Sequence, residues 1–205
     1  LMASEAASGF SKLAQSFIGF SEVSGQSRVA LSQLAGGFER LGISGFGENL
    51  NMATFAMGMT AKEAGNLQLE LLGTEQALQL PAGAIMKEFL PAMEKLTQYT
   101  NDRAIKVFKA LAGQSKATGL AISDLMRIAG QFDTFQGAAE AAGRFNAMLG
   151  GDFLNSMELL NATEEQRIEI IKSGFSTSGK QFSDLSRFEK QAIASSLGLK
   201  SVAEA

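Results

Sequence analysis

The chain has 205 residues, 18 of them basic and 21 acidic, so its formal net charge is −3 at pH 7. It contains no cysteine, no histidine and no tryptophan, which excludes disulfides, zinc–thiolate sites and the commonest general base. Positive charge is not clustered, so we expect no specific nucleic-acid binding. We also expect a protein that is not an enzyme and uses no metal and no cofactor.

Signals for helices recur along the chain, whereas strand signals are scarce. Three segments begin with the Ser/Thr-x-x-Glu/Gln spacing of a capping box: Thr60/Glu63, Thr163/Gln166 and Ser186/Glu189. Gly119, Gly130 and Gly198 stand where helices should end. The pattern predicts an all-α protein. A long N-terminal helix or a helical hairpin would be followed by a bundle of short helices.

Apolar residues in segment 1–41 recur with a seven-residue spacing. One heptad position holds Phe10, Phe17, Leu31 and Phe38, and another holds Leu13, Phe20, Leu34 and Leu41. Such a repeat is typical of a coiled coil. A hairpin that turns at residues 24–27, with each arm amphipathic, is an alternative. We expect these eight residues to mediate self-association into a homo-oligomer, with a trimer favoured and a hexamer possible.

The remaining chain divides into two parts by composition. Residues 42–59 are rich in Gly and Met and are interpreted as a flexible joint. Residues 60–205 are predicted to be helical, and short helices over 101–205 should form a compact part. At the end of the chain, Ser201 and Glu204 have the spacing of another capping box. Together with Leu1 in place of an initiator Met, this leads us to expect a piece of a longer protein.

The acidic residues have simple structural interpretations. Glu164 and Glu165 occupy a first helical turn, where negative charge complements the helix dipole. Asp133 is interpreted as the cap of the following helix, and Asp152 and Glu158 lack a third metal ligand nearby. Gly150 and Gly151 indicate a helix stop and a sharp reversal, and Gly143 would let two helices approach closely.

Four strings carry a recognisable pattern: KVFKALAGQSKATGL (106–120), FDTFQGAAEAAGRFNAMLG (132–150), GDFLNSMELLNATEEQRIEII (151–171) and FSDLSRFEKQAIASSLG (182–198). They resemble a recurrent region of tail tape measure proteins of long-tailed, contractile-tail phages. The similarity covers roughly residues 75–205, and NAMLGGDFLNSMELL is its most specific part.

The resemblance implies a structural role in the virion, within the lumen of the tail tube near the baseplate. Proteins of this family set tail length, assemble with chaperones, contact tail tube and baseplate hub proteins, and leave ahead of the DNA during ejection. Contact with the host membrane during ejection is a further expectation. The low charge and the run NMATFAMGM (51–59) favour an alternative, a membrane-active or pore-forming helical module.

Overall fold

The structure is a computed structural model that describes residues 3–199, 201 and 202. Eleven α-helices and three shorter helical turns account for the regular structure of the described residues, so the all-α prediction is confirmed. The chain forms two compact units, residues 1–109 (unit 1) and 110–205 (unit 2). The division falls inside α6 (Asn101–Thr118), not in the joint expected at residues 42–59. The proposed capping box at Ser201 extends to Glu204, which lies outside the described residues.

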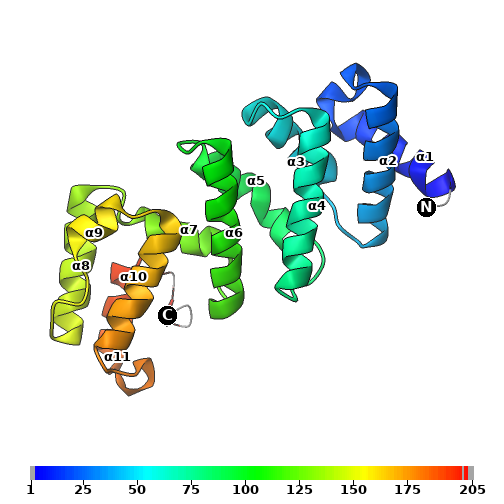
Figure 1. The fold of residues 1–205 in the computed structure, drawn as a ribbon. Helices are drawn as coiled ribbons and strands as arrows, with labels where there is room; N and C mark the ends of the chain where they lie inside the picture. The colour runs from blue at the N-terminus through cyan, green and yellow to red at the C-terminus, as the bar shows by residue number, and fades with distance from the viewer. Residues whose placement is uncertain (1–2, 200, 203–205) are drawn as a thin grey trace. The chain divides into compact units, whose positions relative to one another are not determined.

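Unit 1 begins with a helical hairpin. Helix α1 (Ala3–Ser16) is followed by the 3-10 helix η1 (Ile18–Glu22) and by α2 (Gly25–Arg40), and α1 packs along α2 (Figure 1). The chain reverses before α2, and Ser24 caps that helix by accepting a hydrogen bond from the amide of Ser27 (3.3 Å). The prediction of a single long N-terminal helix is therefore wrong. The hairpin forms, and its reversal comes earlier than residues 24–27.

The hairpin arms approach closely because a glycine lies at their crossing. A methyl group built on Gly9 of α1 would be 2.2 Å from the carbonyl oxygen of Ser32 and 2.8 Å from the amide nitrogen of Gly36. Both are backbone atoms of α2, so only a residue without a Cβ allows this separation. By contrast, a methyl group built on Gly37 of α2 would have no atom within 4 Å.

Residues 42–59 are folded and do not form a joint. They contain α3 (Phe46–Asn51) and the π-helix η2 (Met52–Ala56). Leu50 and Ala53 are fully buried, and Phe46 packs on Phe38 of α2 with ring centroids 4.9 Å apart. The side-chain amide of Asn49 donates to the carbonyl oxygen of Met86 (3.1 Å). These contacts make the segment part of the core of unit 1.

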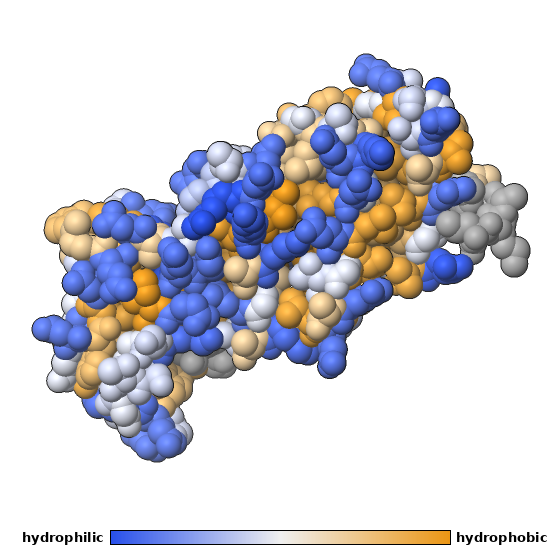
Figure 2. Space-filling view, viewed as in Figure 1, coloured by the Kyte–Doolittle hydropathy of each residue, from blue (hydrophilic) through white to orange (hydrophobic). Residues whose placement is uncertain are grey.

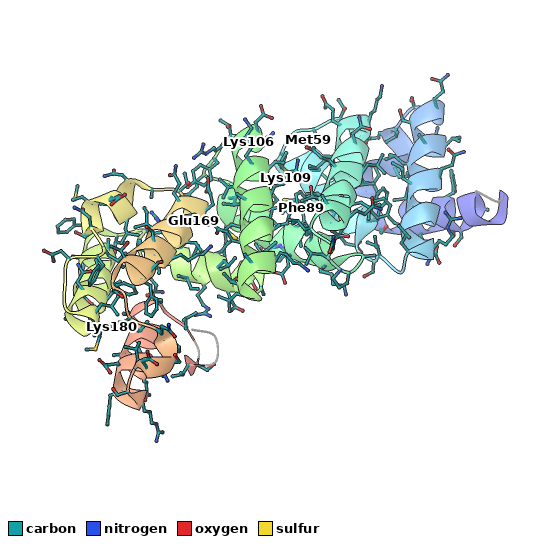
Figure 3. The ribbon with its side chains drawn as sticks, turned by 60° about the horizontal axis from the view of Figure 1, so that its bottom comes forward. Met59, Phe89, Lys106, Lys109, Glu169 and Lys180 are labelled. Atoms are coloured by element: carbon teal, nitrogen blue, oxygen red, sulfur yellow. The ribbon has the colours of Figure 1, made fainter. Side chains whose placement is uncertain are left out.

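Helices α4 (Ala61–Ala77) and α5 (Ala84–Leu96) complete unit 1 with the first half of α6. Phe89 of α5 (labelled in Figure 3) packs edge-to-face on Phe108 of α6, with ring centroids 5.5 Å apart. The buried carboxylate of Glu75 on α4 accepts hydrogen bonds from the amides of Gly83 (2.8 Å), Ile85 (2.7 Å) and Met86 (3.1 Å). One helix thus supplies the acceptor that the N-terminal turn of the next helix needs.

Unit 2 begins with the second half of α6 and continues through α7 to α11. These segments are α7 (Ile122–Gly130), α8 (Phe135–Leu149), α9 (Ser156–Asn161), α10 (Glu164–Thr177) and η3 (Phe182–Asp184), and α11 is Arg187–Ser196. Helix α8 lies against α9 and α11, and α10 lies against α7. Short helices therefore form a compact bundle within this unit.

Capping chemistry sets several of the helix starts. The predicted capping boxes at Thr60/Glu63 and Ser186/Glu189 are confirmed. At Thr163/Gln166 one half of the box is present, in which the amide of Thr163 donates to the side-chain oxygen of Gln166 (3.0 Å). Hydrogen bonds from the side chain and the backbone of Thr60 lower the pKa of Glu63, and bonds from Ser186 likewise lower the pKa of Glu189. Gly119 and Gly198 follow helix ends with positive φ, as predicted.

Candidate functional site

The structure places most of the eight proposed self-association residues inside unit 1. Leu13, Phe17, Phe20, Leu31 and Phe38 are buried in its core, and Leu34 is half-buried. Phe10 and Leu41 are each 47% exposed, and Phe10 packs edge-to-face on Phe20 with centroids 5.0 Å apart. Six of the eight heptad residues are therefore covered within the chain, and Phe10 and Leu41 are the two that remain largely exposed.

The acidic residues singled out in the sequence do not converge. Glu164 and Glu165 lie in the first turn of α10, as predicted, and Asp152 is an exposed loop residue. Glu158 follows Asn155, whose side chain caps α9 by accepting from the amides of Met157 and Glu158. No group of three or more possible metal ligands occurs within the part of the chain that the structure describes.

Asn146 organises the reversal at Gly150 and Gly151. Its side-chain oxygen accepts hydrogen bonds from the amides of Phe153 (3.0 Å) and Leu154 (2.8 Å), and its side-chain nitrogen donates to the carbonyl of Leu154 (2.8 Å). Gly150 has a φ of +83° and ends α8. One amide side chain therefore fixes the connection from α8 toward α9, within the string NAMLGGDFLNSMELL.

Arg167 of α10 connects three segments of unit 2. Its guanidinium donates to the carbonyls of Ala129 (2.9 Å), Leu159 (2.8 Å) and Leu160 (3.3 Å). These carbonyls belong to the last turns of α7 and α9, where no intrahelical donor is present and the helix dipole favours a cation. Arg167 also pairs with Asp133, so Asp133 is an ion-pair partner and the cap of α8 is Thr134. The buried arginine thus stabilises two helix ends at once.

Sequence reasoning missed Arg167 and Glu75, although a signal for both is present. Arg167 stands at a buried position of α10, whose core-facing residues include Ile168 and Ile171. Glu75 continues the buried face of α4 that contains Leu67 and Leu71. A charged residue on the apolar face of a helix has to be paired or hydrogen-bonded. The partners themselves are 7 to 38 residues away in the sequence, so the spacing alone does not identify them.

The surface carries exposed apolar side chains. Ile18, Phe55, Phe135 and Phe188 are among the exposed large apolar residues, and Figure 2 shows further apolar surface over α2 and α4 of unit 1. Over the residues for which the structure gives positions, no helix combines the length and the apolar character that crossing a bilayer requires.

Gly143 does not mediate a close helix approach. A methyl group at this position would have no neighbouring atom within 4 Å, so the expectation from the sequence is wrong. The close approach in this part of the chain occurs at Gly174 of α10 instead. There a methyl group would be 2.7 Å from the Leu154 side chain and 2.9 Å from the carbonyl oxygen of Phe153.

Comparisons of the chain with protein-family models, with curated proteins and with solved structures found no match.

Proposed function

We propose that the chain is a structural segment of a phage tail tape measure protein. In this role it lies in the lumen of the tail tube near the baseplate, contributes to tail length and leaves the tube ahead of the DNA. It performs no reaction of its own. Its partners are the proteins of the tail tube and the baseplate hub, with assembly chaperones before the tail is complete and contact with the host membrane during ejection.

One observation carries the proposal. Three of the four strings with the resemblance fall within unit 2, and the polar side chains in them are used to hold helices together. Asn146 fixes the connection between α8 and α9, and Arg167 binds the ends of α7 and α9. Polar residues of these strings therefore hold helices together, which supports a structural role rather than a catalytic one.

We further propose that several copies act together, with three per tail favoured. The predicted seam of Phe and Leu residues is occupied within unit 1, so copies would meet through surface residues. Phe10 and Leu41 are the two members of that set that remain largely exposed. A subunit with such a surface can associate with others around a cyclic axis, as expected in a tail.

The effect of this segment on tail length tests the proposal. An uninterrupted helix of 205 residues would add about 310 Å at about 1.5 Å per residue. The longest described helix has 18 residues, and the helices of each unit reverse direction. We therefore expect an in-frame tandem duplication of the whole segment to lengthen the tail by well under 310 Å in electron micrographs.

Two controls make the length measurement decisive. An insert of equal length with an uninterrupted heptad repeat should lengthen the tail by the full helical rise. A tail of unchanged length after the duplication would argue against a role in length determination. A tail lengthened by about 310 Å, the full rise of a continuous helix, would instead show that the segment is an extended helix in the tail.

A further inference from the structure

Unit 2 contains an apolar groove that the proposed structural role does not use. It has a volume of about 730 Å³ and is bounded by the end of α6 and by α7, α8, α10 and α11. Its deepest side chains are all apolar and buried: Leu125, Ile128, Phe145, Ile168, Ile171 and Ile193. This volume is within the range of about 300 to 1,000 Å³ found for small-molecule sites. We name it the unit 2 groove.

The mouth of the unit 2 groove remains apolar. Leu120, Phe175, Phe182 and Leu199 line it and are half-buried. The ring of Phe175 lies between two others, with its centroid 6.4 Å from that of Phe145 and 6.3 Å from that of Phe182. An aromatic series thus leads from the buried floor to the surface. A ligand with an extended apolar chain would cover these side chains over its whole length.

The two charged side chains in the lining are lysines, and each pairs with a glutamate that is not part of the lining. Lys172 and Lys180 line the groove together with the neutral side chains of Ser176 and Gln181. Lys172 lies 3.4 Å from Glu169 and Lys180 lies 3.8 Å from Glu189, and all four side chains are at least one-third exposed (Lys180 and Glu169 are labelled in Figure 3). Lys180 also donates to the carbonyl oxygen of Met148 (2.9 Å). Exposed ion pairs such as Lys172–Glu169 and Lys180–Glu189 are weak, so an incoming carboxylate can replace the glutamate as the partner of a lysine.

We propose that the unit 2 groove binds one long-chain fatty acid, with its acyl chain against Ile171 and Phe175 and its carboxylate at Lys172 and Lys180. Charge and shape together select this ligand. A neutral apolar molecule would leave the lysines without a new partner, and a cationic amphiphile would be repelled by them. A phospholipid would need room for two acyl chains and a headgroup, whereas the groove has a volume of about 730 Å³.

Calorimetric titration of the 205-residue chain with dodecanoate, kept below its critical micelle concentration, tests the proposal. We expect saturable binding of one dodecanoate per chain. Dodecyltrimethylammonium, which has the same apolar chain and the opposite charge, should bind at least tenfold more weakly. Lys172→Ala with Lys180→Ala should weaken dodecanoate binding about tenfold, and both substitutions are at exposed positions that leave the core intact.

Two further variants separate binding in the groove from binding elsewhere. Ser176→Trp places a large ring at the exposed edge of the groove and should abolish binding, whereas Lys62→Ala, on the surface of unit 1, should leave it unchanged. Absence of saturable binding, equal affinity for the cation, or full binding by the lysine variant would each overturn the proposal. Binding to anionic phospholipid vesicles without binding of dodecanoate would also overturn it and assign the lysines to a membrane surface.

Discussion

Replacing Arg167 by alanine is expected to lower the free energy of unfolding of unit 2 by about 3 to 5 kcal/mol, since hydrogen bonds to charged groups contribute about 1.5 to 3 kcal/mol each. The substitution removes one donor from each of the carbonyl oxygens of Ala129, Leu159 and Leu160, at the ends of two helices. It also leaves a space where the buried side chain packed. Urea unfolding, combined with hydrogen exchange of the amides in α7 and α9, measures the loss.

Arg144 provides the matched control for that substitution. It lies on the exposed face of α8 and pairs with Glu140 at a distance of 3.3 Å. An exposed pair of this spacing contributes about 0.3 to 0.5 kcal/mol, so Arg144→Ala should have little effect on stability. Arg167→Lys keeps the charge but loses the planar fork that reaches several carbonyls, and we expect an intermediate loss. Equal effects of Arg144→Ala and Arg167→Ala would contradict the role given to Arg167.

Replacing Gly9 by alanine is expected to lower the free energy of unfolding of unit 1 by about 2 to 3 kcal/mol, as overpacking a tight contact does. The added methyl group would meet the backbone of α2 at Ser32 and Gly36, at 2.2 and 2.8 Å. Backbone atoms cannot rotate away as a side chain can, so the two arms of the hairpin have to separate. Thermal unfolding of the variant, with hydrogen exchange of α1 and α2, measures the effect.

The same substitution at Gly37 should act in the opposite direction. A methyl group there has no neighbour within 4 Å, and Gly37 lies in the last turn of α2. Replacing a helical glycine by alanine at an unobstructed position stabilises by about 0.5 to 1 kcal/mol, because alanine loses less backbone entropy on folding. If Gly9→Ala were as harmless as Gly37→Ala, the close crossing of α1 and α2 would not exist in solution.

Local signals in the sequence were sufficient to predict the helical class and several helix limits. A capping box such as Thr60/Glu63 depends only on residues three apart, so it can be recognised without tertiary information. The same is true of Gly119 and Gly198, where a left-handed residue ends a helix. The reversal at Gly150 and Gly151 was also predicted, although the part played by Asn146 was not.

Tertiary contacts account for what the sequence could not predict. The spacing of Phe10, Phe17, Leu31 and Phe38 fits a continuous heptad and a hairpin equally well, because each arm is amphipathic by itself. The residue that decides between them is Gly9, which permits a close approach to the backbone of α2 that no spacing rule reveals. In segment 42–59, high Gly and Met content indicated mobility, but burial of Leu50 and Ala53 in unit 1 makes the segment helical.

The location of the chain in the virion tests the proposed function most directly. Mass spectrometry of purified phage tails, treated from outside with protease, should recover peptides from both units. The same peptides should disappear from particles that have ejected their DNA. Tails without these peptides, peptides that the external protease removes from intact tails, or peptides that remain in the tube after ejection would contradict a tape measure segment.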